Sequence, residues 1–284
     1  MLGRSDPQVS IVIPAYNEAP RILDSLRLLR DYFGASSGSC RSFEVLIVVE
    51  HSADGTLELA RQAIAEQANF HLIDNRVQRG KGYAVRSGMR QARGALRFYM
   101  DADLSVPLEE IGNFLAWFEA HPGDDILLGS RQHAQSRIER RQGLLRQTMG
   151  KTFNRILRTL SLIPFHDTQC GFKAFRASAA QEIFALQTID GFAFDVEVIL
   201  LAQGLGYRIA ELPVRWLNSP ESKVHIVRDS ARMLLDAVTV RRRVDRMMRL
   251  RDLRKGAASE PGSSIGPDGQ PEVSRGWSEE EPLE

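Results

Sequence analysis

Short apolar runs alternate regularly with longer segments of helical spacing, and this alternation constrains the fold more than any other feature of the sequence. Between the runs, segments such as Pro20–Phe33 repeat apolar residues at the spacing of one helix face. Strands that are apolar on both faces and alternate with helices predict an α/β fold, with a mostly parallel sheet covered by helices on both sides. The predicted strands are Val9–Ile13, Phe43–Val49, Phe70–Ile73, Ala95–Met100, Ile126–Leu128 and the alternating segment Tyr207–Trp216. Lys151–Leu162 is predicted as a further helix.

Three polar loops follow the ends of predicted strands, at Tyr16–Glu18, Glu50–Asp54 and Asp101–Asp103. Ligands of such sheets bind beyond the carboxyl ends of the strands, so we expect the three loops on one rim. Asp101 and Asp103 lie just past a strand, where both carboxylates can reach one hard cation. Mg²⁺ typically takes one or two carboxylates together with phosphate oxygens. The pair therefore predicts a metal site for a phosphate-bearing substrate, the alternative being a solvated turn.

Two basic segments indicate anion binding. Residues 79–82, Arg-Gly-Lys-Gly, open a predicted helix whose N-terminal amides could hold an anion together with Lys81, although the spacing is not that of a P-loop. Residues 131–146 carry five arginines, whose guanidinium groups match phosphate oxygens. Arg131, beside a strand end, and Arg146, entering a helix, are the candidates for binding. Nucleic acid is disfavoured, because the net charge is only +1 and interleaved stacking aromatics are absent.

The C-terminal region divides into a basic helix and an acidic tail. Ile226–Lys255 is predicted as one helix with ten basic residues against four acidic ones. The apolar stripe of this helix consists of Met233, Ala237, Val240, Val244 and Met247. This pattern is typical of a helix lying on an anionic membrane, the alternative being that the stripe packs on the domain or on another chain. Residues 256–284 are rich in Gly, Pro and Ser, with seven acidic residues and one Arg, and are predicted to be disordered.

The cellular location is predicted from what the sequence does not contain. The two cysteines, Cys40 and Cys170, do not form a disulfide framework, which favours a reducing compartment. Met1–Val9 lacks the apolar core of a signal peptide, and no apolar stretch approaches the roughly 18 residues of a membrane span. We therefore expect a cytoplasmic protein, held peripherally at the inner face of the membrane by the basic helix.

Several motifs resemble those of family 2 glycosyltransferases, which have the GT-A fold. The opening Val9–Glu18 resembles the nucleotide-binding start of that family, and Asp101–Asp103 stands where its metal motif belongs. The second half is similar to dolichyl-phosphate β-glucosyltransferases and their bacterial relatives. The resemblance covers about Val9–Val227. The motifs of the second half are Leu128–Arg131, Asp167–Lys173, Phe194–Glu197, Glu211–Trp216 and Ser222–Val224.

This resemblance implies an inverting transfer of a sugar, with glucose favoured, from a nucleotide-diphospho-sugar such as UDP-glucose to a polyprenyl phosphate. Asp101 and Asp103 would hold Mg²⁺ or Mn²⁺ against the diphosphate, and Arg131 and Arg146 would hold the acceptor phosphate. The remaining contacts to the nucleotide sugar would come from Pro14, Tyr16, Glu18, Glu50 and Lys81.

Two positions leave alternatives open. Asp195 matches the general base of relatives with hydroxyl acceptors, but an acceptor phosphate is already anionic, so Asp195 is expected to orient groups in the site or to cap a helix. The loop Glu50–Asp54 is one residue shorter than the paired-Asp, Gly, Ser loop of relatives, so Glu50 would replace the carboxylate that contacts the base or ribose, and the nucleotide stays open.

The predicted organisation is an N-terminal extension (1–8), a GT-A domain (9–227), the basic helix (226–255) and the tail (256–284). Two other functions remain possible from the sequence. One is glycosyl transfer to a soluble or protein hydroxyl, with Asp195 as the base. The other is a non-catalytic protein that binds sugar nucleotides, which only the altered loop at Glu50 supports.

Overall fold

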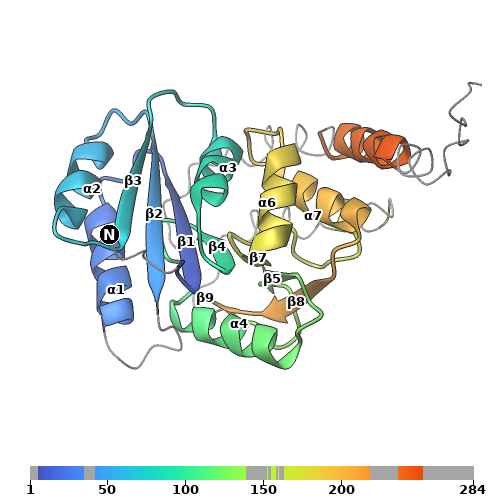
Figure 1. The fold of residues 1–284 in the computed structure, drawn as a ribbon, viewed down its shortest axis with the longest axis horizontal. Coiled ribbons are helices and arrows are strands. Elements are labelled where there is room, and N and C mark those ends of the chain that lie inside the picture. The colour runs from blue at the N-terminus through green and yellow to red at the C-terminus, as the bar shows by residue number, and fades with distance from the viewer. Residues whose placement is uncertain are drawn as a thin grey trace, which may run out of the picture. The chain divides into compact units, whose positions relative to one another are not determined.

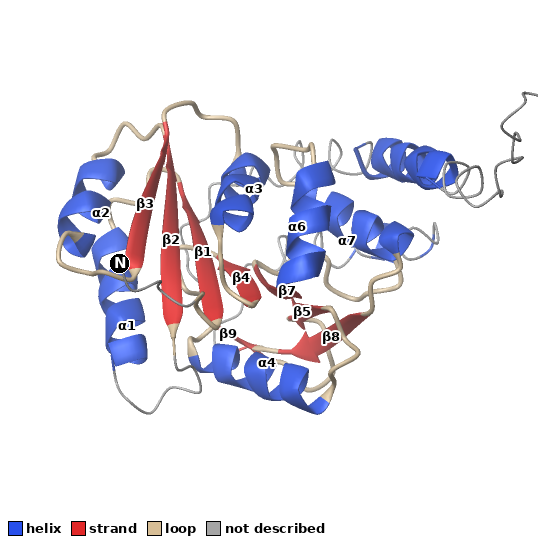
Figure 2. Cartoon of the chain, viewed as in Figure 1, coloured by secondary structure: helices blue, strands red, loops and turns tan. Residues whose placement is uncertain are grey.

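A central sheet organises the first of two compact units into which the chain divides, Met1–Asp245 and Arg246–Glu284 (Figures 1 and 2). The computed structural model describes residues 6–34, 42–138, 152, 155–157, 159, 163–217 and 236–251. Arg146, most of the predicted helix Lys151–Leu162 and the acidic tail lie outside these residues.

The sheet has seven strands in the spatial order β3-β2-β1-β4-β7-β5-β8. All neighbouring strands are parallel except β7, which is antiparallel to β4 on one side and to β5 on the other. The prediction of a mostly parallel sheet is confirmed, with β7 as its one reversal among the described residues. The strand bounds are β1 Val9–Ala15, β2 Phe43–Glu50, β3 Phe70–Asn75, β4 Leu96–Met100, β5 Ile126–Ser130, β7 Phe172–Arg176 and β8 Ile209–Pro213.

Helices cover both faces of the sheet, as the apolar strands predict (Figure 1). On one face, α1 (Ile22–Gly34), α2 (Thr56–Ile64) and α4 (Glu109–Ala120) share a buried cluster with alternate residues of β1 and β2. On the other, α3 (Lys81–Gln91) packs on β1 and β2 and against α6 (Ala177–Leu186), which also contacts α7 (Phe194–Leu205). The helices cover the faces of the sheet, so a site is expected at the ends of the strands.

The segment Tyr207–Trp216, predicted as one alternating strand, forms two. β8 pairs in parallel with β5 in the main sheet. After Pro213, β9 (Arg215–Trp216) pairs instead with β6 (Arg137–Ile138) in a separate two-stranded ladder. Proline carries no amide hydrogen for a ladder, so the change of partner directly after Pro213 fits the backbone chemistry.

Residues 236–251 form a helix, the described part of the long C-terminal helix that the sequence predicts. The stripe residues Ala237, Val240 and Val244 are buried, so this part of the stripe is covered by protein, as the packing alternative predicts. Arg243 also forms an ion pair with the buried Glu197 of α7. Among the described residues, no helix has the length and apolar character needed to cross a bilayer.

Candidate active site

The rim at the carboxyl ends of β1 and β2 is held together by hydrogen bonds between the two loops that leave these strands. The Asn17 amide donates to Ser52 Oγ (3.0 Å), and the Ala53 amide donates back to Asn17 Oδ1 (2.9 Å). The Glu18 amide donates to Thr56 Oγ1 (2.8 Å). These contacts confirm that the first two polar loops lie side by side. The candidate nucleotide residues at the end of β1 and in the first loop, all half-buried, are Pro14, Tyr16 and Glu18.

The third loop, which follows β4, carries the two candidate metal ligands. Asp101 Oδ1 accepts from Lys81 Nζ at 2.6 Å, so the first residue of α3 reaches the end of β4. The Asp101 amide donates to the Gly171 carbonyl at 3.2 Å. A Cβ on Gly171 would overlap the Asp101 carboxylate, so any larger residue there would have to displace that carboxylate. Asp103 Oδ1 accepts from the Ser105 amide at 3.0 Å, which closes the turn.

The carboxylates of this turn carry more negative charge than Lys81 balances, which favours the binding of a cation. Burial, with the neighbouring charge of Asp101, raises the pKa of Asp103 above its ordinary value. Burial alone would lower the pKa of Lys81, but the negative charges of Asp101 and Asp195 outweigh burial and raise it. Lys81 therefore stays protonated, and the carboxylates still lack positive charge.

The turn fits a hard divalent cation that takes part of its ligands from a bound phosphate group. The described residues include no group of three or more His, Cys, Asp or Glu side chains able to form a metal site by themselves. A pair such as Asp101 and Asp103 suits a cation that also takes oxygen ligands from a bound diphosphate and from water. The close approach of the Gly171 backbone to the Asp101 carboxylate and the raised pKa of Asp103 are consistent with such a ligand set.

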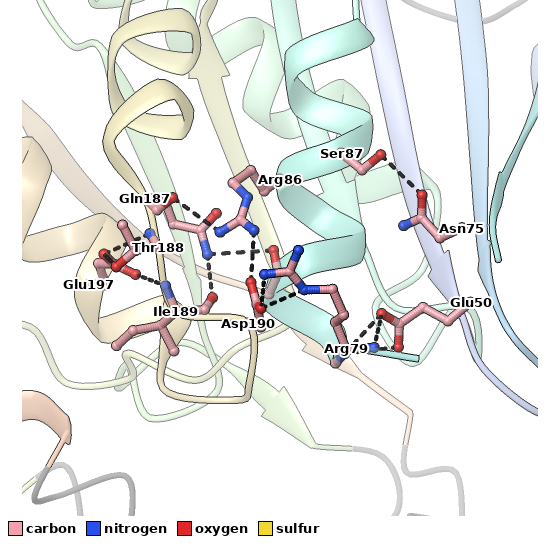
Figure 3. Close-up of polar contacts among 12 residues, drawn as sticks. Glu50, Asn75, Arg79, Arg86, Ser87, Gln187, Thr188, Ile189, Asp190 and Glu197 are labelled. Carbon is pink, nitrogen blue, oxygen red and sulfur yellow. Dashed lines mark hydrogen bonds and ion pairs between the residues drawn. The ribbon is translucent and has the colours of Figure 1, made fainter. Parts of the chain in front are cut away.

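Glu50, the last residue of β2, lies at the N-terminus of α3 (Figure 3). Its carboxylate accepts from the amides of Arg79 (3.1 Å) and Gly80 (2.9 Å), and Glu50 is only 3% exposed. A helix N-terminus attracts anions, and here the protein supplies its own. Glu50 thus takes the amides of the turn that precedes α3. Binding of a ligand anion at this helix start stays a prediction. Direct contact of Glu50 with the base or ribose stays a prediction.

The start of α3 is held from the other side by the loop between α6 and α7 (Figure 3). The Asp190 carboxylate pairs with Arg79 (2.6 Å) and Arg86 (2.7 Å). The Asp190 carbonyl accepts from the Tyr83 amide at 3.2 Å. Gly80 has φ +128°, and a Cβ there would lie 2.6 Å from that carbonyl. Asp190 therefore fixes the turn that carries Lys81.

Asp195, in the first turn of α7, is buried behind the β4 end. Its Oδ1 accepts from Tyr99 Oη and from Lys173 Nζ, each at 2.6 Å. Burial and the charge of Asp195 raise the pKa of Tyr99 well above its ordinary value, so Tyr99 donates as a neutral phenol. The alternative that Asp195 caps the helix is wrong, because the residue at the cap position of α7 is Ala193 and Asp195 lies inside the first turn. Asp195 instead accepts two hydrogen bonds from buried side chains.

Arg131, which follows β5, is bound to the buried Asp167. Its Nε and Nη2 donate to the two Asp167 oxygens at 2.7 and 2.9 Å, and its amide donates to Asp167 Oδ2 at 2.9 Å. The Arg131 guanidinium also lies 5.8 Å from the centre of the Trp216 ring. Burial alone would lower the pKa of Arg131, but Asp167 raises it further above its ordinary value.

Lys81 forms an ion pair with Asp101, and the charges of Asp103 and Asp195 also act on Lys81, so these four candidate residues lie near one another. Their role in a single site stays a prediction. Sequence reasoning missed the buried residues that hold them in place, because each was read only as part of a strand, a loop or a motif. One signal was available: a charged residue inside an apolar strand predicts a buried partner. The missed residues are Tyr99, Asp167, Lys173 and Asp190.

Comparison with known proteins identifies the family of the chain. The profile of "Glycosyl transferase family 2" matches residues 10–184. The chain belongs to this family. One similar relative is the dolichyl-phosphate beta-glucosyltransferase of Dictyostelium discoideum, with 32% identity over 242 residues (82% of this chain, 73% of the relative). The Saccharomyces cerevisiae protein of that name is 30% identical over 252 residues (82% and 74%).

Solved structures of glycosyltransferases share the fold, which confirms the GT-A prediction. Glucosyl-3-phosphoglycerate synthase from Mycobacterium tuberculosis, solved with Mn²⁺, UDP and phosphoglyceric acid, superposes with a TM-score of 0.55 at 15% identity. The match covers 82% of this chain and 77% of the synthase. At that identity, the likeness concerns the fold alone.

Proposed function

We propose that this protein catalyses the inverting, metal-dependent transfer of glucose from a nucleotide-diphospho-glucose to a polyprenyl phosphate of the dolichyl type. The observation that carries the proposal is the carboxylate pair Asp101 and Asp103 beside Lys81, in a family member whose relatives are named dolichyl-phosphate beta-glucosyltransferases. UDP-glucose is the favoured donor, which the UDP complex of the M. tuberculosis synthase supports.

On the donor side, Asp101 and Asp103 would hold Mg²⁺ or Mn²⁺, and the bound cation would make the nucleoside diphosphate a better leaving group. Lys81 adds a protonated ammonium 2.6 Å from Asp101, within reach of the same phosphates. Glu50 contributes by fixing the turn before Lys81. The end of β1 and the loop after it would line the nucleotide with Pro14, Tyr16 and Glu18.

On the acceptor side, a phosphate oxygen of the lipid attacks C1 of glucose as the bond from C1 to the diphosphate oxygen breaks. The acceptor oxygen is already anionic at neutral pH, so no strong base is needed, and Asp195 would orient groups in the site. Asp167 takes Nε and Nη2 of Arg131, which leaves Nη1 for a second anion, the acceptor phosphate. Arg146, outside the described residues, is proposed as its partner.

We place the reaction at the inner face of the membrane, where a lipid acceptor is within reach of a cytoplasmic enzyme. The stripe residues Ala237, Val240 and Val244 are buried, so attachment would depend on basic side chains such as the exposed Arg242. Binding to anionic vesicles that falls steeply between about 0.1 and 0.5 M salt would support this attachment. Equal binding to neutral and anionic vesicles would contradict it.

The decisive experiment incubates the purified protein with labelled UDP-glucose, Mn²⁺ and either a polyprenyl phosphate or the matching polyprenol. Glucosylated lipid only with the phosphate is expected, together with loss of product when the metal is chelated. Transfer to the alcohol or to a soluble hydroxyl, lost in Asp195→Asn, would favour the hydroxyl-acceptor alternative. Metal-dependent UDP binding without turnover on any acceptor would favour a non-catalytic binding protein.

A further inference from the structure

Lys173 is a fully buried lysine in the middle of the sheet. It lies on β7, between β4 and β5, and its strand neighbours Phe172 and Ala174 are also fully buried. A charged ammonium in such surroundings is unfavourable unless it is paired and hydrogen-bonded. Lys173 therefore needs a reason to be there, and its contacts supply one.

The Lys173 ammonium makes two short contacts in different directions. Nζ lies 2.6 Å from Asp195 Oδ1, the carboxylate at the general-base position of relatives. Nζ also donates to the Cys170 carbonyl at 2.6 Å. Tyr99, directly opposite Lys173 in the β4–β7 register, donates to the same Asp195 oxygen. One buried cation thus links Asp195 to the Cys170–Gly171 turn.

The Cys170–Gly171 turn packs directly against the candidate metal ligand Asp101. The Gly171 carbonyl accepts from the Asp101 amide at 3.2 Å, and there is no room for a side chain between the Gly171 backbone and the Asp101 carboxylate. A shift of this turn would move Asp101. Because Lys173 binds the carbonyl of the preceding residue, Lys173 controls where the turn lies.

We propose that Lys173 is a positioning residue, which holds Asp195 and the turn that packs against Asp101 in one fixed arrangement around the donor diphosphate. Lys173 acts through Asp195 and the turn, and Tyr99 supports it. The proposal rests on the proposed function only in taking the β4 end as the donor site.

A double-mutant cycle tests whether Lys173 and Asp195 act as a unit. Lys173→Met keeps the length of the side chain and removes the charge, Asp195→Asn removes the opposing charge, and the third protein carries both changes. The measurement is Mn²⁺-dependent UDP binding by calorimetry at a temperature where each protein is folded, with the melting temperature recorded alongside. The binding measurement does not require glucosyl transfer. A wild-type protein without transfer activity would therefore contradict the proposed function and leave this test valid.

Lys173→Met is expected to weaken UDP binding by about 10- to 100-fold, the range typical of residues that orient metal ligands. The double variant should lose no more than the worse single variant, because both changes break one unit. Wild-type affinity in Lys173→Met, or losses that simply multiply in the double variant, would overturn the proposal.

Two further variants keep the test decisive. Arg97→Met is the matched control, because Arg97 is also a buried cation that donates to backbone carbonyls, at the other end of β4. It should lower the melting temperature and leave UDP affinity unchanged. Where Lys173→Met does not fold, Tyr99→Phe takes its place in the cycle with Asp195→Asn, with a smaller weakening expected and unchanged affinity counting against the proposal.

Discussion

Two carboxylates near the same edge of the sheet have opposite surroundings. Asp167 is fully buried, and both of its oxygens accept from Arg131. The side chain of Asp101 is 40% exposed, and its one ion pair among the described residues is with Lys81. Burial alone would raise the pKa of Asp167, but Arg131 outweighs it and lowers that pKa, whereas burial and Asp101 raise the pKa of Asp103. The protein neutralises the charge of Asp167 with Arg131, whereas Asp101 and Asp103 together carry more negative charge than Lys81 neutralises.

This difference separates a structural pair from a ligand site, and it can be tested one region at a time. Asp167→Asn should have the largest effect on stability, because it leaves the Arg131 guanidinium without its charged partner. Breaking a buried pair typically lowers the free energy of unfolding by about 3–5 kcal/mol. Urea titration measures this, with Asp245→Asn as the control, since the Arg241–Asp245 pair is half-exposed. A loss below about 1 kcal/mol would contradict the contrast.

Asp101→Asn should have its largest effect on activity. The amide keeps the shape of the side chain but removes the charge that would hold the metal, so we expect transfer to fall by roughly 100- to 1,000-fold, or about 3–4 kcal/mol in the barrier. The melting temperature without metal should change little. Product formation from labelled UDP-glucose is the measurement, with the exposed Asp24→Asn as control. Near wild-type turnover would remove Asp101 from the site.

Asp103→Asn should slightly stabilise the metal-free protein at neutral pH. A carboxyl whose folded pKa is raised is protonated in both states at low pH and has no effect there. As the pH rises, the unfolded chain ionises first, so the folded state loses stability until the pH passes the folded pKa. Removing the charge should recover less than about 1 kcal/mol at pH 7. Melting curves at pH 7 and pH 3.5 check this; a lower melting temperature at pH 7 would contradict it.

The smallest expected effect concerns Cys170, between the two regions. Burial raises the pKa of this thiol to about 12, so almost no thiolate is present at neutral pH. In a Cys40→Ser background, Cys170 should not react with a thiol reagent in the folded protein and should react fully in denaturant. Rapid reaction of the folded protein would show that the Cys170–Gly171 turn opens, and would weaken the role given to Lys173.

The donor half of the sheet could be predicted from the sequence, because its signals are local. Each apolar run there ends in polar residues, as Met100 is followed by Asp101, and parallel strands bring such ends together. The reversal of β7 could not be predicted, because residue spacing is the same for a strand running in either direction. The split of Tyr207–Trp216 could not be predicted either. Pro213 indicates a break in the strand, but the sequence does not show which strand the residues after it pair with.

The supporting contacts of the site were hidden because they depend on tertiary structure. Glu50 meets the start of α3 only after β2 and α3 pack, so its sequence position suggested a ligand contact instead. Lys173 and Tyr99 come together through the antiparallel register of β4 and β7, more than 70 residues apart in the sequence. Spacing rules describe one segment at a time and do not reach such pairs.

The reversed strand β7 also has a consequence for how the chain folds during synthesis. β1 to β4 are complete once Met100 has been made, but the outer edge of β4 stays unpaired until Phe172–Arg176 emerges from the ribosome. During that interval the nascent protein carries an open strand edge, which invites pairing with other chains. Pairings between distant segments also form slowly. Truncated chains that end before β7 should therefore aggregate, whereas chains that include it can close the sheet.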